Sequence, residues 1–280
     1  MAGTALVLGG GGLTGIGWEI GMLTGLAEAG IDLAGADVVI GTSAGSIVGA
    51  HLTAEHLTLE EMYEHQLAAP EGRSGARMGP AAMARFAAIA LRSRDAVSFG
   101  ARMGRLAVAA RTVPEAEQRA VIARTLGHAQ WPPRRLVITA VDSTTGERTA
   151  FDNASGVPLV DAVTASCAVP GVFPPVTIDG KRWIDGGVHS SANADLAAGY
   201  RRVVVVAPMA VSGGPIAAPR TQGETLARQG ARVCVITPDR EARAAFGRNV
   251  LDPAKRADAA RAGRRQSSAH TRDVARVWSG

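Results

Sequence analysis

Cysteine, aromatic residues and long apolar runs are all scarce in this sequence. Only Cys167 and Cys234 occur among 280 residues, in dissimilar contexts, which argues against a disulfide framework or a cysteine metal cluster and fits a reducing compartment. No run of about 18 apolar residues is present, so we expect no transmembrane helix. The N-terminal MAGTALVLGGGG lacks the basic start of a signal peptide. We therefore expect a cytoplasmic protein.

Positive charge is missing from one part of the chain. Residues 1–60 contain six acidic residues and no Lys or Arg; they carry −6 and residues 61–280 carry +11, which gives the net charge of +5. Part of this excess lies in DPAKRADAARAGRR, residues 252–265, which we interpret as a solvated helix face that could also contact an anionic membrane. The low aromatic content and the lack of a nucleic-acid-binding motif argue against a nucleic-acid partner.

The first 55 residues alternate between short apolar runs and helical patterns. TALVLGG and ADVVIG are typical of buried strands that end in glycine. The segment GIGWEIGMLTGLAEAG places Trp18, Met22 and Leu26 on one helix face and ends at Gly30, and AGSIVGAHLTAE predicts a second helix. This strand–helix–strand–helix order predicts a parallel sheet with crossover helices.

The sequence pattern changes in residues 56–130, where only helical spacing is found. They contain Ala, Met, Arg and Leu at helical spacing and no strand-like run of β-branched residues, with breaks at Pro70, Pro80 and Pro114. We interpret this block as an all-helical insertion that forms a lid or flank of the site, or serves only as scaffold.

Strand patterns return after residue 130. RRLVITAVD and RTAF predict a hairpin around STTGE, VTIDGKRWIDGG predicts a second hairpin around Asp-Gly, and VPLVDAVTASCAVP predicts a helix ended by Pro170. YRRVVVVAP and ARVCVITP are typical of strands buried on both faces, and the segment from DPAKRADAARAGRR predicts a surface helix. The expected fold is α/β, a mostly parallel central sheet flanked by helices. We expect one domain over 1–280: a core at 4–55 and 131–208, the helical insertion at 56–130, and a C-terminal strand and basic helical tail at 209–280.

The segment GTSAG, residues 41–45, follows a predicted strand and precedes a predicted helix. In a nucleophile elbow, a strained turn lifts the serine hydroxyl clear of the sheet, and glycine is favoured two positions away because side chains there would collide. Ser43 is thus a candidate nucleophile, with Gly41 and Gly45 as its supporting glycines. The alternative is an ordinary strand–helix turn.

The segment LGGGGLTG, residues 8–15, forms a glycine loop between a strand and a helix. Gly10, Gly11, Gly12 and Gly15 fit the G-x-G-x-x-G pattern of dinucleotide-binding turns, but Asp37 begins the second strand, whereas a dinucleotide site needs an acid at its end. We favour an anion-binding loop whose backbone N–H groups form an oxyanion hole. A tight turn without a ligand remains the simpler alternative.

The segment WIDGG, residues 183–187, places Asp185 at the end of a predicted strand before Gly186 and Gly187. Asp-Gly commonly marks a turn, but IDGKRW already supplies the turn of this hairpin, so the second Asp-Gly calls for another explanation. His189 is the one histidine close to Asp185 in sequence. Its spacing favours a neighbouring polar residue over a catalytic base.

The three motifs occur in an order that resembles the patatin-like phospholipase family. ASCAVPGVFPPV, residues 165–176, also resembles the segment that this family carries before its aspartate, and the resemblance covers about residues 4–208. It implies a serine acyl hydrolase of lipids or other carboxylic esters, with a Ser43–Asp185 dyad and an acyl-enzyme intermediate. It also implies that the amides of Gly10, Gly11 and Gly12 hold the oxyanion and that no metal or organic cofactor is needed.

One position departs from the family pattern. Thr14 occupies a place in the glycine loop where many relatives carry Arg or Lys, so the loop offers no fixed positive charge to a phosphate head group. Two other functions stay open at this point. The first is an acyltransferase of the malonyl-CoA:acyl-carrier-protein transacylase type, with Ser43 and a histidine. The second is a non-enzymatic phosphate-binding module.

Overall fold

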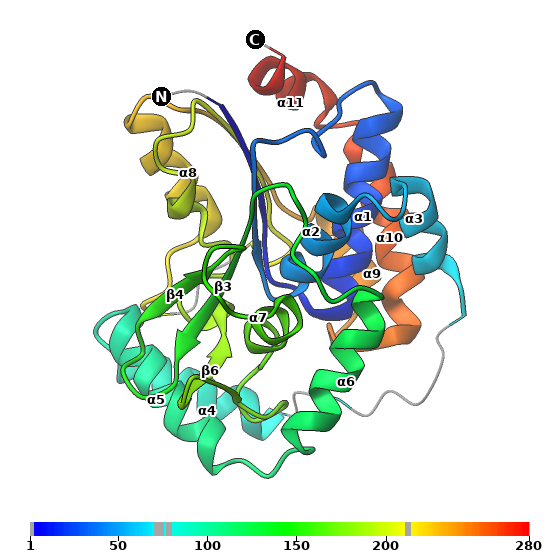
Figure 1. The fold of residues 1–280 in the computed structure, drawn as a ribbon. Coiled ribbons are helices and arrows are strands. Elements are labelled where there is room, and N and C mark those ends of the chain that lie inside the picture. Colours follow the sequence, from blue (N-terminus) through cyan, green and yellow to red (C-terminus); the bar gives the residue numbers. More distant parts are fainter. Residues whose placement is uncertain (1–2, 70–75, 77–79, 211–213, 280) are drawn as a thin grey trace.

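An eight-stranded sheet forms the centre of the molecule (Figure 1). The computed structural model describes residues 3–69, 76, 80–210 and 214–279. The strands are β1 (Thr4–Leu8), β2 (Val38–Thr42), β3 (Leu136–Asp142), β4 (Arg148–Phe151), β5 (Val176–Ile178), β6 (Lys181–Asp185), β7 (Arg202–Val206) and β8 (Arg232–Ile236). Their order across the sheet is β5-β6-β3-β2-β1-β7-β8, with β4 beside β3. The predicted α/β class is confirmed.

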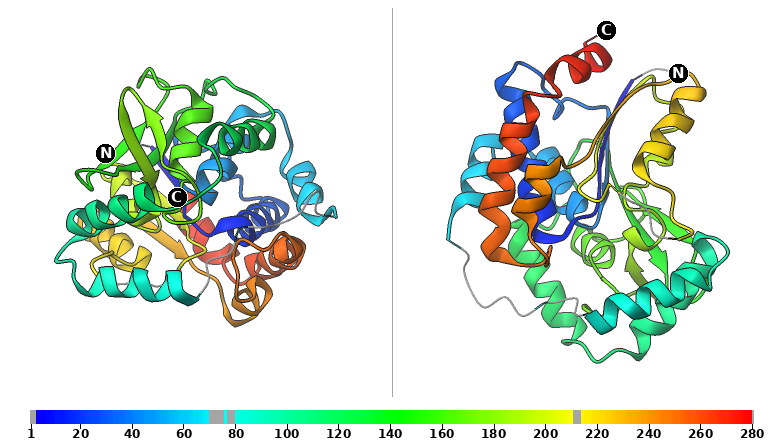
Figure 2. Two further views of the ribbon diagram at one scale, coloured as in Figure 1. Left: turned by 90° about the horizontal axis from the view of Figure 1, so that it is seen from below. Right: turned by 180° about the vertical axis from the view of Figure 1, so that it is seen from behind.

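Helices cover both faces of the parallel part of the sheet, from β3 to β8. Leu6 and Leu8 of β1 point to the face packed with α1 (Gly12–Glu28), α2 (Ala44–Ala54) and α7 (Leu159–Ser166). Ala5 and Val7 point to the opposite face, where α8 (Pro219–Arg228) and the short helix η2 (Ala194–Ala197) lie (Figure 2). Burial on both sides explains why β1, β2 and β7 are continuous apolar runs rather than alternating ones.

β8 is packed on both faces, as expected, but it is less completely buried than the other parallel strands. β8 pairs only with β7 among the described strands and forms an edge of the sheet. Its first residue, Arg232, is exposed, and the next three residues are only partly buried. An edge strand keeps one side open to solvent, so an apolar sequence run does not by itself establish full burial.

The antiparallel part of the sheet determines where two chain segments meet. β4 lies along one edge of β3. The other edge is shared: β2 pairs with the first part of β3 up to Thr42 opposite Thr139, and β6 pairs with the last part up to Asp185 opposite Ala140. Because β2 runs parallel to β3 and β6 runs antiparallel, the carboxyl ends of β2 and β6 point toward each other along one edge.

The described part of residues 56–130 contains only helices as regular elements. These are α3 (Leu59–Leu67), α4 (Pro80–Leu91), α5 (Ala96–Ala109) and α6 (Glu115–Leu126). Pro80 begins α4 and Pro114 is the N-cap of α6, whereas the break predicted at Pro70 lies outside the described residues. α5 packs closely on the β3–β4 turn, since a Cβ on Gly104 would lie 1.8 Å from the Ser143 carbonyl oxygen.

The C-terminal segment packs into the molecule more closely than a surface helix would. It contains α9 (Arg240–Phe246), η3 (Pro253–Lys255), α10 (Arg256–Ser267) and α11 (Thr271–Trp278). α10 runs against α1 so closely that a Cβ on Gly21 would lie 2.0 Å from the Ala260 carbonyl oxygen. Small residues on both helices allow this approach, and the side of α10 facing α1 is buried. None of the described helices combines the length and apolar content needed to cross a bilayer.

Candidate active site

Ser43 occupies a sharp turn between β2 and α2. Its backbone has φ 51° and ψ −115°, a strained conformation for a residue with a side chain. The turn is so tight that a Cβ on Gly45 would lie 2.2 Å from the Leu8 carbonyl oxygen, and one on Gly41 would lie 2.6 Å from the Gly45 carbonyl oxygen. These contacts match the reason for which glycine was expected at both positions.

Asp185 lies directly beside Ser43, although 142 residues separate them. The Ser43 hydroxyl donates a hydrogen bond of 2.7 Å from Oγ to Asp185 Oδ2, while the Gly187 N–H donates to Asp185 Oδ1 at 2.7 Å. The meeting of the β2 and β6 ends along β3 produces this contact. Ser43 and Asp185 are only 8% and 5% exposed, so the pair is largely shielded from water.

Burial makes the Asp185 carboxylate a stronger base than an ordinary aspartate. Desolvation raises the pKa of Asp185 to about 6, even though the hydrogen bonds from Ser43 and Gly187 act in the opposite direction. The carboxylate is still mostly ionised at neutral pH. A base with a pKa closer to the working pH is better suited to accept a hydroxyl proton.

The glycine loop lies against Ser43, but its three amides differ in availability. The Gly10 N–H donates to the Ser191 carbonyl oxygen at 2.7 Å. The N–H groups of Gly11 and Gly12, at the start of α1, have no acceptor among the described residues. A Cβ on Gly11 would lie 2.5 Å from Pro208 Cβ. Packing against the protein itself thus requires glycine at this position, in addition to any need for access by a ligand.

Thr14 points away from solvent and ties the loop to the C-terminal segment. It is fully buried, and its N–H and hydroxyl both donate to the Val250 carbonyl oxygen, at 3.1 and 3.4 Å. In this chain, Thr14 therefore holds the glycine loop in place through the backbone of the C-terminal segment.

Comparison with known proteins gives the family. A model of the patatin-like phospholipase family matches residues 6–198. The chain belongs to the patatin-like phospholipase family. This is a family of lipid acyl hydrolases. No curated protein matches it.

Two solved structures are similar to this member of the family. VipD from Legionella pneumophila is 14% identical, with a TM-score of 0.48, and the match covers 97% of this chain and 66% of that one. The type III effector protein ExoU is 14% identical, with a TM-score of 0.42, and the match covers 98% of this chain and 53% of that one. The chain thus spans less than two thirds of the length of either structure.

The helix α7 (Leu159–Ser166) and the residue after it support the turn at Ser43. Ser166 Oγ accepts a hydrogen bond of 2.8 Å from the Ser43 N–H, and the next residue, Cys167, directs its thiol to the Ser43 carbonyl oxygen at 3.4 Å. Burial raises the pKa of Cys167 to about 12, so the thiol stays neutral. Both residues belong to ASCAVPGVFPPV, which the sequence analysis noted without assigning either residue a role.

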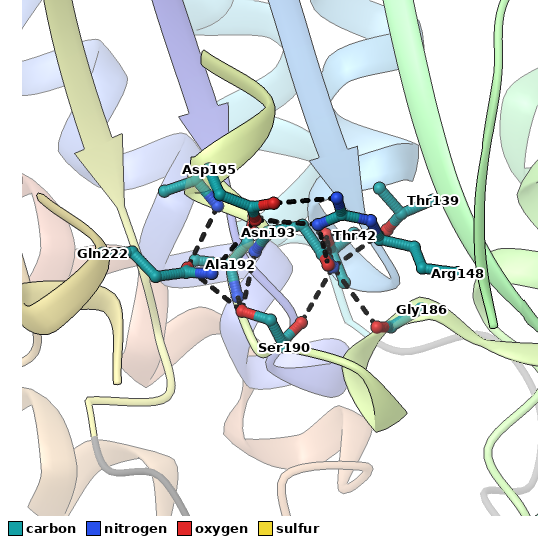
Figure 3. Close-up of polar contacts among 10 residues, drawn as sticks. Thr42, Thr139, Arg148, Gly186, Ser190, Ala192, Asn193, Asp195 and Gln222 are labelled. Atoms are coloured by element: carbon teal, nitrogen blue, oxygen red, sulfur yellow. Dashed lines mark hydrogen bonds and ion pairs between the residues drawn. The ribbon is translucent and has the colours of Figure 1, made fainter. Parts of the chain in front are cut away.

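Asn193 joins the strand ends that carry the two candidate catalytic residues (Figure 3). Its side-chain nitrogen lies 3.0 Å from Thr42 Oγ1, 3.2 Å from Thr139 Oγ1 and 3.2 Å from the Gly186 carbonyl oxygen. Thr42 precedes Ser43 and Gly186 follows Asp185, so one buried amide contacts the neighbours of both. The sequence analysis missed Asn193, because a single Asn in a polar loop carries no distinctive spacing.

An ion pair holds Asn193 in place. Arg148 of β4 donates to Asn193 Oδ1 at 3.1 Å and forms two hydrogen bonds to Asp195, of 2.7 and 2.8 Å. Gln222 of α8 also bonds to Asp195 and accepts from the Ser190 hydroxyl (Figure 3). The network therefore connects β4 and α8 to the carboxyl ends of β2 and β6, where Ser43 and Asp185 lie.

No histidine hydrogen bonds to Ser43 or Asp185. All six histidines lie in the described part of the chain, and none appears among the partners of either residue. His189 is half-buried near Arg148 and Asp195, where burial lowers its pKa and favours the neutral imidazole. Its position agrees with the expectation of a neighbouring polar residue.

Proposed function

We propose that this chain hydrolyses carboxylic esters of lipids through a dyad of Ser43 and Asp185. The observation that supports the proposal most directly is the 2.7 Å hydrogen bond from Ser43 Oγ to Asp185 Oδ2 at a strained elbow. A serine hydroxyl needs a base within hydrogen-bond reach to act as a nucleophile, and Asp185 meets this condition without a histidine.

In the first half of the proposed reaction, Ser43 Oγ attacks the ester carbonyl carbon while its proton moves to Asp185 Oδ2. The carbonyl oxygen becomes an oxyanion. Collapse of the tetrahedral intermediate breaks the bond to the alcohol oxygen, and Asp185 returns the proton to this leaving alcohol. The product at this stage is an acyl ester on Ser43.

In the second half, water replaces the alcohol. Asp185 accepts a proton from water, the resulting hydroxyl group attacks the acyl carbon, and collapse of the second intermediate releases the fatty acid. The proton on Asp185 then returns to Ser43 Oγ. The raised pKa of Asp185 suits a group that accepts and gives up a proton in each half.

We assign the oxyanion contacts to the N–H groups of Gly11 and Gly12. Neither has an acceptor among the residues that the structure describes, and both lie at the N-terminus of α1, where the helix dipole favours negative charge. Gly10 has a different role in this proposal, because its N–H is already bonded to Ser191. It lets the loop approach the nucleophile, since a Cβ there would lie 3.5 Å from Ser43 Cβ.

The test compares Ser43→Ala and Asp185→Asn with two control variants, Ser268→Ala and Asp179→Asn, on a medium-chain p-nitrophenyl ester. We expect each dyad variant to lose roughly 1,000-fold or more in kcat/KM with unchanged folding, and both controls to keep full activity. A fluorophosphonate should label Ser43, as shown by mass spectrometry. Full activity of either dyad variant would contradict the proposal.

The histidine-dependent transacylase is tested by His189→Ala. Because His189 contacts neither Ser43 nor Asp185, we expect ester turnover to stay within about twofold of wild type, as for substitutions away from the reacting atoms. A collapse of turnover in this variant would favour the transacylase instead.

We further propose a cytoplasmic protein that works at the surface of a membrane. Cys167 and Cys234 are both free thiols, which fits a reducing compartment. Its substrates, in this proposal, are lipids or simpler esters that it reaches by peripheral contact with the bilayer.

A further inference from the structure

The chain has two arginine-rich regions, and they differ in how their charge is neutralised. In the C-terminal helices, Arg264 pairs with Glu28 and Glu60, and Arg265 pairs with Glu241. Arg261 and Arg276 pair with aspartates one helical turn away. Much of the positive charge of this tail is therefore matched by carboxylates of the chain itself.

The helices α4 and α5 and the turns that follow them carry arginines without such partners among the residues that the structure describes. Residues 81–114 contain six arginines and a single acidic residue, Asp95. Asp95 caps α5 through the Ser98 N–H. None of the six arginines forms an ion pair with any residue that the structure describes, and five of them are exposed; the six are Arg85, Arg92, Arg94, Arg102, Arg105 and Arg111.

Apolar side chains are exposed on the same two helices. Phe86 and Ile89 of α4 pack with Phe99 and Met103 of α5 in one cluster, so both helices turn their outer sides to solvent. On these outer sides Leu91 is 87% exposed, and Met83, Val97 and Val108 are 41–54% exposed. On α5, Val97 and Val108 share one side of the helix with Arg105, because spacings of eight and three residues bring them onto one face. At α4, Arg85 and Arg92 are exposed, as are Met83 and Leu91.

These helices lie next to the candidate active site. α5 packs against β3, β6 and the turn η1 (Gly186–Val188), which directly follows Asp185. Both helices lie at the end of the molecule where α6 also begins (Figure 1), and Figure 2 shows the same arrangement from behind. A surface that bound these helices would therefore lie on the side of the molecule where α5 packs against the turn after Asp185.

We propose that the outer side of α4 and α5 docks the enzyme onto an anionic membrane. We call this surface the α4–α5 face and define it by Met83, Arg85, Leu91, Arg92, Val97, Arg105 and Val108. Arginines next to exposed aliphatic side chains fit the boundary between lipid head groups and acyl chains, where the charges meet phosphate and the apolar groups enter the bilayer. A nucleic acid would use the arginines but would leave Leu91 and Met83 exposed. This proposal rests on the proposed function in one respect: a hydrolase of lipid esters has to reach its substrate at a membrane.

The experiment measures binding of the full-length protein to vesicles by cosedimentation, in a Ser43→Ala background that keeps the lipid intact. The vesicles contain equal parts of phosphatidylglycerol and phosphatidylcholine, or phosphatidylcholine alone. We expect preferential binding to the anionic vesicles that weakens as NaCl is raised. The Arg85→Gln, Arg92→Gln, Arg105→Gln triple variant should bind on the order of 100-fold more weakly, since each arginine near an anionic surface contributes several-fold.

A matched triple variant removes the same charge elsewhere. It replaces three exposed arginines by Gln: Arg201 before β7, Arg228 in α8 and Arg272 in α11. We expect this control variant to bind vesicles as well as the protein without these substitutions. A Met83→Ser, Leu91→Ser variant keeps all charges and should bind about tenfold more weakly. Thermal unfolding of each variant separates loss of binding from loss of folding.

Four results would overturn the proposal: no binding to anionic vesicles, equal binding to neutral vesicles, an equal loss in the control triple variant, or full binding by the α4–α5 variants. Tight binding of a single-stranded oligonucleotide that competes with the vesicles would favour a nucleic-acid partner instead.

A separate assay distinguishes failure of the docking proposal from failure of the proposed function. It measures hydrolysis of a water-soluble short-chain ester by the protein with Ser43 intact. An enzyme that cleaves this ester but ignores vesicles contradicts only the docking face, and one that binds vesicles but cleaves no ester contradicts only the dyad.

Discussion

At the scale of single residues, the environment of Asp185 links activity to pH. The carboxylate has to be ionised to accept the Ser43 proton, and burial raises its pKa to about 6. We therefore predict that kcat/KM for a soluble ester falls as the pH drops through about 6, tenfold for each further pH unit. An acid limb near pH 4, the range of an unperturbed aspartate, would contradict this environment.

The same raised pKa lowers the stability of the fold at neutral pH. A carboxyl whose pKa is higher in the folded state stabilises the fold below its unfolded pKa of about 3.9, and this contribution is lost as the pH rises through about 6. Asp185→Asn removes the buried charge. We predict that its free energy of unfolding exceeds that of wild type by on the order of 2 kcal/mol at pH 8 and by much less at pH 4, as measured by urea titration.

Asn193 should act on catalysis through position, because it contacts the neighbours of both dyad residues. We predict that Asn193→Ala lowers kcat by about 100-fold while KM changes little, as expected for a displacement of reacting groups on the scale of 1 Å. Asn153→Ala, in an exposed turn, is the matched control. If Asn193→Ala only lowers the melting temperature and keeps kcat, Asn193 has a purely structural role.

The residues of the site were predictable from sequence to different degrees. Ser43 and Asp185 could be singled out because the backbone around them requires glycine, and glycine at fixed spacing is visible in a sequence. Ser166 and Asn193 could not, because each depends on a fold-level contact across more than 100 residues and polar side chains in loops are common. The hydrogen bond from the Gly10 N–H to the Ser191 carbonyl oxygen could not be predicted either, because it depends on the position of a residue far away in the sequence.

At the scale of secondary-structure elements, the sequence predicted the parallel strands and main helices well, because apolar runs and helical spacing are local signals. The incomplete burial of β8 was not predicted, because it follows from the edge position of this strand, which no local sequence signal reveals. The burial of one side of α10 was missed as well. Its alanines and arginines are typical of a solvated helix, and only the glycines of α1 make close packing possible.

The close packing of α1 and α10 predicts that a glycine-to-alanine substitution within a helix lowers the free energy of unfolding. Alanine favours helices over glycine by about 1 kcal/mol, so Gly21→Ala in an isolated helix would be stabilising. Here its Cβ would lie 2.0 Å from the Ala260 carbonyl oxygen, and we predict a loss of about 3 kcal/mol in the free energy of unfolding. Gly35→Ala, where the Cβ would meet nothing closer than 3.4 Å, is the control. Equal stabilities of the two variants would contradict the packing.

At the scale of the whole molecule, the acidic N-terminal part of the sequence forms ion pairs with the basic C-terminal helices. The acidic N-terminal part supplies Glu28 and Glu60, and α10 supplies Arg264. Exposed pairs of this kind are worth little individually, so the buried side of α10 contributes most of the attachment. We propose on this basis that residues 1–280 fold as one domain.

Removal of the C-terminal segment tests this proposal. The family match ends at residue 198, yet α10 covers α1 and the Val250 carbonyl oxygen holds Thr14 of the glycine loop. We predict that a chain ending at residue 208 shows no cooperative thermal unfolding by circular dichroism and no ester hydrolysis. A truncated protein that unfolds cooperatively and remains active would show that the tail is dispensable.

The bond between Thr14 and Val250 also has a consequence for biosynthesis. The two residues are 236 positions apart, so the glycine loop emerges from the ribosome early and waits for its partner until residue 250 has been translated. Ser43 and Asp185 are both synthesised before that point, but the glycine loop beside them still lacks its anchor. A chain that stops short of residue 250 therefore carries both candidate catalytic residues beside an unanchored loop.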